Sequence, residues 1–551
     1  MKHKKLYSVL STALITAAAI SGCGNSEISG QSVNPADNSS GEAITENSSN
    51  TSSLNSIRMN AESSANSSGG YNVTWEDMAD IIIVYPTMST IQPGLSAVED
   101  AMNEITESEI NTHVSLRMIE VGNYDQQMNL MMSSGEQVDL AITMPAGPSS
   151  FATMTSQKQL MDITNLLEEY APRALAGVGS LIGGTQINGH TYAFPAYKSF
   201  SSGIYINMRT DVLNDLGLLE KAQNMTTLTE YGEIMEAVKA SDQWKYLAGC
   251  AATDGHGAVL ALNGTAGFSD NFSDTTFLDN LGDTLFTVGI RNDDDTVLNV
   301  YASEEFKKNY EIVRGWYEKG LVYKDSATTA EMGTSLVKSN IVFSYTSQIE
   351  IGAESSADTN CGMDMTSVRI AEVPITTSNL TKFTWAIPNT AKEPEAAATF
   401  LEMMFTDSRI ANLFAWGIEG TDYEIDNDGI AHYIEGNETP AYHGVNFLNA
   451  NKFILAPWEG EDPKLNAQQE EQMKNAAASK YLGFACDTTA ITDEISAINN
   501  AIEQYKAQII SGAADEATFN EFLQKLEDVG IQTVVDTYQT QLDAWLKATG
   551  K

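Results

Sequence analysis

The alternation of buried strands with amphipathic helices after residue 71 most constrains the fold of this 551-residue chain. Residues 81–84 form an apolar, β-branched run that ends at Tyr85 and Pro86, which is typical of a fully buried strand. Residues 95–105 place apolar side chains three and four positions apart, which predicts a helix. Strand patterns follow at 114–118 and 138–142. This alternation predicts βαβ units and a parallel sheet, in which ligands bind beyond the carboxyl ends of the strands.

The first residues of the chain have the pattern of a secretory signal. Three lysines and a histidine at positions 2–5 precede an apolar stretch at 9–20, which is too short to cross a bilayer comfortably. Ser21 and Gly22 stand before Cys23, and this arrangement resembles a bacterial lipobox. The resemblance implies that residues 1–22 are removed and that Cys23 is lipidated. The alternative is a plain signal peptide with an incidental cysteine.

Residues 24–70 are expected to form a disordered tether behind the lipidated cysteine. The segment contains 14 Ser, 8 Asn and no aromatic residue. Such a composition cannot bury enough apolar surface to offset the entropy of ordering. The tether would hold the folded part, which we expect to be soluble, away from a lipid surface.

Charge and cysteine content exclude several functions. The chain has 31 basic and 73 acidic residues, a formal net charge of −42. Binding to nucleic acid or to an anionic membrane surface needs a basic footprint, so we expect neither. Cys250, Cys361 and Cys486 have no CxxC spacing, which leaves a zinc or redox site unsupported. We expect three buried free thiols, with a single disulfide as the alternative.

A second set of elements follows along the chain. An Asn-Gly turn at 188–189 predicts a hairpin, and strands are expected at 203–207, 341–345 and 383–387. Helices are expected at 211–219, 229–240 and 395–405. Between 495 and 546, apolar residues at helical spacing predict three amphipathic helices. We expect them to pack on the body of the protein, with a partner-binding bundle as the alternative.

These stretches, taken in order, resemble the bacterial extracellular solute-binding proteins of ABC importers, the family-1 group, and within it the LplA/LipO-type lipoproteins with a C-terminal extension. The resemblance covers about residue 75 to the end. The motifs that carry it are the segments 160–172, 188–195 (NGHTYAFP), 207–211 (NMRTD), 416–423 (WGIEGTDY), 483–484 and 538–545.

The resemblance implies an α/β, two-lobe, periplasmic-binding-protein-like fold of type II with a hinge and a C-terminal helical extension. The expected N-lobe comprises residues 71–196 and about 383–428. The expected C-lobe comprises 197–382 and about 429–551, including C-terminal helices over 488–548. Hinges are expected near 196–198, near 383–385 and around 423–433, since closure of two lobes around a ligand needs flexible crossings.

Sequence motifs for catalysis or metal binding are weak. None of the six His lies in HExxH spacing, and neither GxSxG nor GxxxxGK[ST] occurs. We therefore expect no enzyme and no cofactor. Asp426-Asn427-Asp428-Gly429 resembles the start of a calcium loop, but the twelfth position holds Asn437 where the EF-hand pattern needs Glu. We interpret this segment as a hairpin turn and expect no metal.

Candidate ligand-binding residues come from strand ends and from the hinges and loops that the resemblance places. Aromatic faces suit sugar rings, and charged or polar groups can fix hydroxyls. Trp416 is interpreted as structural, and Asp139 as ordering a strand or loop. The candidates are Tyr85, Thr143, Met144, Tyr197, Lys198, Asp254, His256, Tyr345 and Trp385.

The resemblance implies a monomeric, lipid-anchored receptor on the outer face of the cytoplasmic membrane, of the Gram-positive type. It would capture a small solute, close around it and deliver it to an ABC permease. An oligosaccharide is the favoured ligand, and a peptide is the alternative. A surface hydrolase or adhesion lipoprotein is a further alternative.

Overall fold

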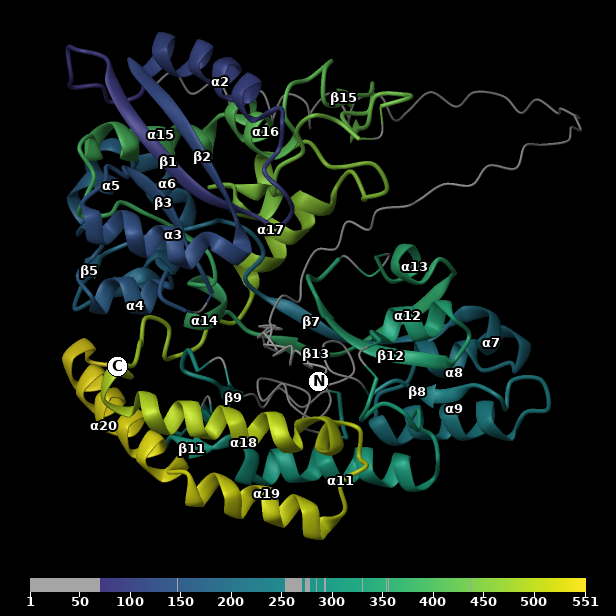
Figure 1. The fold of residues 1–551 in the computed structure, drawn as a ribbon. Coiled ribbons are helices and arrows are strands. Elements are labelled where there is room, and N and C mark those ends of the chain that lie inside the picture. Colours follow the sequence, from purple (N-terminus) through teal and green to yellow (C-terminus); the bar gives the residue numbers. More distant parts are fainter. Residues whose placement is uncertain are drawn as a thin grey trace, which may run out of the picture.

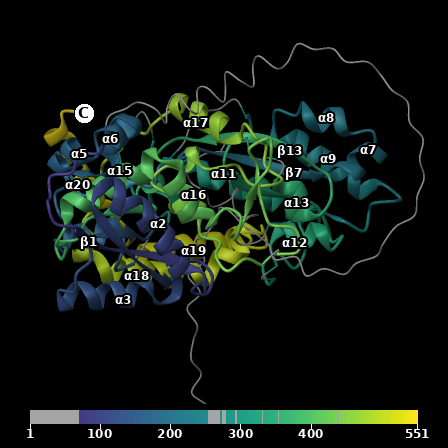
Figure 2. The ribbon, with the colours of Figure 1, turned by 90° about the horizontal axis from the view of Figure 1, so that it is seen from above.

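The computed structural model describes residues 70–551, except for residues 146, 253–269, 273–277, 284, 292–293, 330, 353, 355 and 438. The expectations for the signal, Cys23 and the tether lie outside the described residues, as do those for Asp254 and His256. The described chain forms two lobes, each built around its own sheet (Figure 1). Helices α18 to α20 lie below the N-lobe in Figure 1 and overlap it in the view from above (Figure 2).

The N-lobe contains a five-stranded sheet of order β2-β1-β3-β14-β6. Strand β1 is parallel to both β2 and β3, which confirms the predicted parallel βαβ units. Strand β14 returns from far along the chain and pairs antiparallel with β3 and β6. The strands are β1 (Ala79–Thr87), β2 (Thr112–Glu120), β3 (Leu140–Thr143), β6 (Phe194–Pro195) and β14 (Thr384–Ala386).

Helices cover both faces of this sheet and bury its apolar residues in a large cluster. Helix α3 ends at Gly135, whose φ of 71° allows the left-handed cap that closes it. The predicted Asn-Gly hairpin is present as β4 (Gln186–Ile187) and β5 (His190–Thr191). The helices are α2 (Leu95–Ile110), α3 (Val121–Ser134), α4 (Phe151–Ser156), α5 (Thr164–Tyr170), α6 (Pro172–Val178), α15 (Pro394–Thr406), α16 (Ser408–Trp416) and α17 (Leu465–Asn475), with short 3-10 turns η1 (Gly179–Thr185), η3 (Asn446–Leu448) and η4 (Lys452–Ile454).

The C-lobe contains a four-stranded sheet of order β13-β7-β12-β8, in which β7 is antiparallel to both neighbours. The helix expected at 211–219 is divided into α7 and α8, because Gly217 takes a φ of 66° between them. The elements are β7 (Ser202–Arg209), α7 (Thr210–Asp215), α8 (Leu219–Gln223), α9 (Leu228–Ala240), β8 (Ala248–Cys250), α12 (Gly333–Lys338), β12 (Val342–Ile349), α13 (Ser356–Cys361) and β13 (Met365–Val373). Cys250 and Cys361 are buried free thiols, and Cys486 is a half-buried one.

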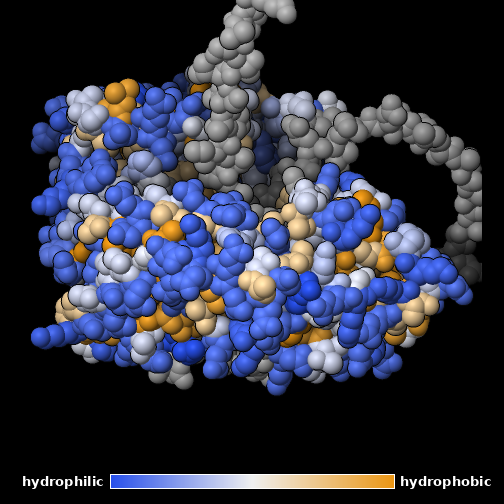
Figure 3. All heavy atoms as spheres, turned by 60° about the horizontal axis from the view of Figure 1, so that its bottom comes forward, coloured by the Kyte–Doolittle hydropathy of each residue, from blue (hydrophilic) through white to orange (hydrophobic). Residues whose placement is uncertain are grey.

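The three predicted C-terminal helices form a second core of the C-lobe. Their apolar faces pack against residues 278–310, and the rings of Phe519 and Tyr310 stack with centroids 4.2 Å apart. The outer face of this region is mainly hydrophilic with scattered apolar spots (Figure 3). The elements are β9 (Leu278–Asp279), β10 (Val288–Arg291), β11 (Leu298–Asn299), η2 (Val300–Ala302), α11 (Glu304–Glu318), η5 (Thr489–Ile491), α18 (Thr492–Ile510), α19 (Glu516–Asp528) and α20 (Ile531–Thr549).

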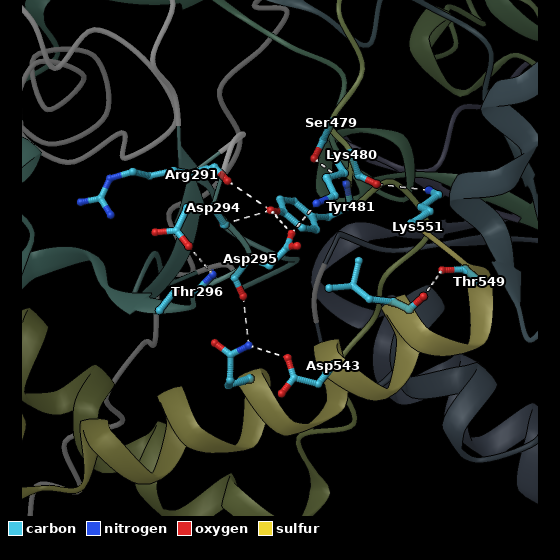
Figure 4. Close-up of polar contacts among 12 residues, drawn as sticks. Arg291, Asp294, Asp295, Thr296, Ser479, Lys480, Tyr481, Asp543, Thr549 and Lys551 are labelled. Carbon is cyan, nitrogen blue, oxygen red and sulfur yellow. Dashed lines mark hydrogen bonds and ion pairs between the residues drawn. The ribbon is translucent and has the colours of Figure 1, made fainter.

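Polar contacts attach the last helix to the segment that enters this core (Figure 4). The Asp295 carboxylate accepts a hydrogen bond from the Tyr481 hydroxyl at 2.9 Å and pairs with the Lys480 ammonium at 2.5 Å. Gln539 on α20 donates to the Asp295 carbonyl at 3.0 Å and accepts from the Val297 amide at 2.7 Å. Helix α20 is therefore joined to residues 480–481 through one hairpin of the C-lobe.

Three crossings connect the lobes in the described part of the chain, and they meet at one place. They lie at 200–202, at 373–375 and at 476–479. The Ile375 amide donates to the Ala477 carbonyl at 2.9 Å, and the Ser479 amide donates to the Ile375 carbonyl at 2.8 Å. The Asn379 side chain, on α14 (Thr377–Leu380), donates to the Phe200 carbonyl at 3.2 Å.

These crossings correct the expected domain limits. The first crossing lies further along the chain than expected, because Tyr197 belongs to the N-lobe core. The second lies before its expected place, because Phe383 belongs to the same core, and the third lies well beyond residues 423–433. The largest change concerns residues 431–458, which pack against α16 of the N-lobe rather than in the C-lobe. Ala450 and Met473 are also in the N-lobe core. The N-lobe therefore comprises about 71–200 and 375–476, and the C-lobe about 202–373 and 478–551.

The expected role of Asp139, which is to order a strand or loop, is confirmed. Its buried carboxylate accepts hydrogen bonds from the backbone amides of Ile82, Lys392 and Glu393, at 2.7–3.0 Å, and from the Gln137 side chain at 2.8 Å. These contacts join β1 to the turn before α15. The carboxylate thus connects parts of the lobe that are far apart in sequence.

We expect Asp139→Asn to lower the free energy of unfolding by about 1–3 kcal/mol, because an amide nitrogen would replace one acceptor of buried N–H groups. Urea denaturation of the protein measures this loss. The control is Asp80→Asn, since Asp80 is exposed on the same strand. Equal midpoints for Asp139→Asn and the wild type would contradict the assignment.

Candidate functional site

The carboxyl ends of β1 and β3 are the expected place for a ligand, and only some of the predicted residues are accessible there. Thr143 is buried, and its hydroxyl lies 2.7 Å from that of Thr384 on β14. Met144, one residue further, is half-buried. Lys198 is half-buried with its ammonium over the rings of Phe383 and Phe447, 5.1 and 4.8 Å from their centroids.

The four predicted aromatic residues lie in protein cores. Trp385 is fully buried, and its indole N–H donates to the Leu448 carbonyl at 2.9 Å. Tyr85 and Trp385 both pack against Phe414, with ring centroids 4.7 and 5.9 Å apart. Tyr197 packs on Phe405 and Phe453, and Tyr345 belongs to a small cluster of the C-lobe. Their rings contact protein, so they form no exposed aromatic surface.

A second group of aromatic residues lies close together and partly exposed. Trp416 ends α16, Tyr433 follows β16 (Ala431–His432), and His443 and Trp458 lie in the loops that follow. Trp458 is the centre of the group: its centroid lies 4.8 Å from that of Trp416, 4.9 Å from Tyr433 and 4.7 Å from His443. Trp416 is buried, and the other three are half-buried. We call these four residues the aromatic cluster.

Backbone hydrogen bonds fix the loops that carry the aromatic cluster. The Ala431 amide donates to the Pro457 carbonyl and the Glu459 amide to the Ala431 carbonyl, both at 2.8 Å. The Trp416 indole N–H donates to the Ala456 carbonyl at 3.1 Å. Strands β15 (Glu424–Ile425) and β16 form the expected hairpin, and Asp426 accepts hydrogen bonds from the amides of its own turn.

The aromatic cluster adjoins the carboxyl end of β1. The Gly94 amide, at the start of α2, donates to the Ala441 carbonyl at 2.8 Å. A Cβ at position 94 would lie 2.9 Å from that carbonyl, so the approach requires glycine. The Gln92 side chain bonds both the amide and the carbonyl of His443. The cluster therefore lies at the edge of the N-lobe sheet where ligands of such sheets bind.

His443 is uncharged at neutral pH. Burial lowers its pKa to about 4, and the nearby Asp422 carboxylate opposes this effect only in part. Its buried Nδ1 atom has no hydrogen-bond partner among the residues that the structure describes. A neutral imidazole ring beside two indoles and a phenol forms a largely apolar surface.

An ion pair joins the lobes beside the crossings. Lys452 lies in η4, a few residues before Trp458 in the chain. Its ammonium lies 2.9 Å from the carboxylate of Glu350 at the end of β12. The Lys452 side chain is 8% exposed and that of Glu350 is 23% exposed. The Lys452 amide also donates to the Tyr197 carbonyl at 2.8 Å. The pair thus connects the second N-lobe segment to the C-lobe sheet.

Sequence reasoning missed the aromatic cluster. It interpreted Trp416 as structural and treated Tyr433 as part of a hinge. The available signal was the density of aromatic residues and histidines between positions 416 and 458, which exceeds what a surface loop needs. Among the described residues, no group of His, Cys, Asp and Glu is arranged to hold a metal ion. No described helix is long and apolar enough to span a membrane.

Comparisons with known proteins agree with this architecture. The family described as "Bacterial extracellular solute-binding protein" matches residues 100–420, and a domain of unknown function, DUF3502, matches residues 480–547. A "Carbohydrate ABC transporter substrate-binding protein" of Streptococcus pneumoniae serotype 4 is 24% identical over 468 residues, which cover 81% of this chain and 87% of that relative.

Solved structures share the fold. The N-glycan transport solute binding protein NgtS from Streptococcus pneumoniae has a TM-score of 0.70 at 20% identity, covering 85% of this chain and 99% of that chain. A solute binding protein associated with an HMO-binding ABC transporter, from Bifidobacterium longum infantis, has a TM-score of 0.58 at 15% identity, with the same coverage of both chains. These neighbours confirm the predicted two-lobe fold.

We expect His443→Phe to reduce the loss of stability on acidification. The unfolded state binds a proton at this residue near pH 6.5, whereas the folded state binds it only near pH 4. Stability of the wild type therefore falls as pH drops through this window, and the variant lacks that contribution. Melting temperatures at pH 7 and pH 4.5 measure it. Equal losses in wild type and variant would show that His443 is not buried as described.

Proposed function

The chain belongs to the bacterial extracellular solute-binding proteins, and we propose that it is the receptor of an ABC importer for an oligosaccharide. The aromatic cluster at the carboxyl edge of the N-lobe sheet is the observation that carries this proposal. The exposed parts of Tyr433, His443 and Trp458 offer apolar ring surface, on which the C–H faces of sugar rings stack. The names of the relatives also favour a sugar over a peptide.

The proposed site uses both lobes. The N-lobe supplies the aromatic cluster, Met144 beyond β3 and Lys198 just before the first crossing. From the C-lobe, we propose that Asp254 and His256, which follow β8 in sequence, bond the sugar hydroxyls. The buried Tyr85, Thr143, Tyr197, Tyr345 and Trp385 would hold the surrounding backbone in place. Binding would be non-covalent, and no catalytic step is proposed.

Closure would follow from the crossings. The three crossings form one hydrogen-bonded group, so the lobes can rotate about it while each sheet stays intact. A ligand that contacts both lobes favours the closed state by the difference in its affinity for the two states. The permease would recognise that closed state.

The anchor belongs to the same proposal. Cys23 would carry the lipid at the outer face of the cytoplasmic membrane, and residues 24–70 would act as the spacer. A monomer is sufficient for this function, since one chain contains both lobes and their crossings.

A thermal-shift screen of the protein against neutral oligosaccharides tests the proposed function. A ligand at about 100 times its dissociation constant adds ~2.7 kcal/mol to the stability of the folded state. We expect at least one sugar to raise the melting temperature. A raised melting temperature with short peptides alone would overturn the proposal that the ligand is a sugar. Release of product from a glycan would overturn the proposal that the protein only binds its ligand.

We expect Trp458→Ala to weaken binding of that sugar about tenfold, because loss of one stacked aromatic ring costs ~1 kcal/mol or more. Isothermal titration calorimetry measures the affinity. The matched control is Tyr246→Ala, since Tyr246 is 62% exposed on the C-lobe, away from the cluster in sequence and sheet. Unchanged affinity in Trp458→Ala would place the site elsewhere.

A further inference from the structure

The segment that carries the aromatic cluster is strongly acidic. Residues 410–463 contain ten acidic residues and one basic residue, Lys452. Two of the acidic residues, Glu435 and Glu459, are exposed close in sequence to Tyr433 and Trp458. A ligand at the aromatic cluster therefore meets negative charge beside Tyr433 and Trp458.

The one basic residue of this segment is already engaged. The Lys452 ammonium is buried and pairs with the Glu350 carboxylate at 2.9 Å. Turning this ammonium toward a ligand would leave the Glu350 charge without its partner, which is costly in a partly buried place. Lys198, just before the first crossing, lies over two phenylalanine rings.

The segments that follow β1, β3, β12 and β8 add no basic residue. Segments 87–94 and 143–150, which follow β1 and β3, contain no charged residue. Segment 345–355, at the end of β12, contains two acidic residues and no basic one. The sequence after β8, at 253–269, contains neither Lys nor Arg. His443 is uncharged at neutral pH, as described above.

Recognition of an anionic sugar requires basic side chains, which recognition of an uncharged sugar does not. Carboxylates and sulfates are bound by Arg or Lys in charge-assisted hydrogen bonds, most often by the bidentate guanidinium. A carboxylate transferred from water to an aromatic surface among acidic residues loses hydration and gains repulsion.

We propose that this receptor selects uncharged oligosaccharides and rejects acidic ones, such as those with uronate residues. This inference rests on the proposed function and narrows its substrate class. Selectivity arises from two features together: aromatic surface for the sugar faces, and surrounding carboxylates that repel an anion.

The test compares one sugar with its own oxidised form. The neutral oligosaccharide that binds best in the screen is oxidised at its primary alcohols to carboxylates, which preserves ring size and linkage. Calorimetry at low salt is expected to give at least tenfold weaker binding for the oxidised sugar. Added salt is expected to reduce the ratio of the affinity for the neutral sugar to that for the oxidised sugar, because screening weakens repulsion between exposed charges.

Two double variants that remove the same charge test which carboxylates cause the preference for the neutral sugar. Glu435→Gln combined with Glu459→Gln is expected to reduce the ratio of the two affinities several-fold. The control combines Glu503→Gln with Glu527→Gln on the C-terminal helices, which removes the same charge far from the cluster in the fold. The control is expected to keep the wild-type ratio.

The outcomes separate this inference from the proposed function. Equal or tighter binding of the oxidised sugar overturns the inference and leaves a sugar receptor. Binding of acidic sugars alone in the screen does the same. Equal ratios in both double variants would overturn the assignment of selectivity to these carboxylates. Failure of every neutral and acidic oligosaccharide to bind overturns the proposed function itself.

Discussion

The hydrogen bonds between the second and third crossings are the constraint on which the rest of the structure depends. Ile375 bonds Ala477 on one side and Ser479 on the other, and Asn379 brings the first crossing to the same place. Because three separate chain segments meet there, each lobe has its own sheet and core while the chain passes between the lobes at one region. A ligand site between the lobes needs that arrangement.

The two lobes contribute differently to the account. The N-lobe presents the aromatic cluster on loops that are fixed by backbone bonds to α16 and to the start of α2. The C-lobe gains a second core from the C-terminal helices, which lead back to the third crossing through the contacts of Asp295 with Lys480 and Tyr481 (Figure 4). The region matched by a domain of unknown function is therefore an integral part of the C-lobe.

Most of the N-lobe sheet and the helices could be predicted because their signals are local: β-branched runs for β1 and β3, and helical spacing for α2 and the C-terminal helices. The burial of Trp385 could not be predicted from local signals. Strand β14 inserts between β3 and β6, where Trp385 pairs with Ile142 and Phe194, and this non-local pairing buries the ring. The aromatic cluster was missed for the same reason, since its four rings come from the end of α16 and from separate loops that no periodicity relates.

A crystal structure of the protein with its tightest-binding neutral oligosaccharide tests the central claim most directly. We expect sugar rings against Trp458 and Tyr433, contacts from both lobes, and backbone rotation confined to the three crossings relative to the unliganded protein. A sugar bound on an outer face of one lobe, with the crossings unchanged, would contradict it.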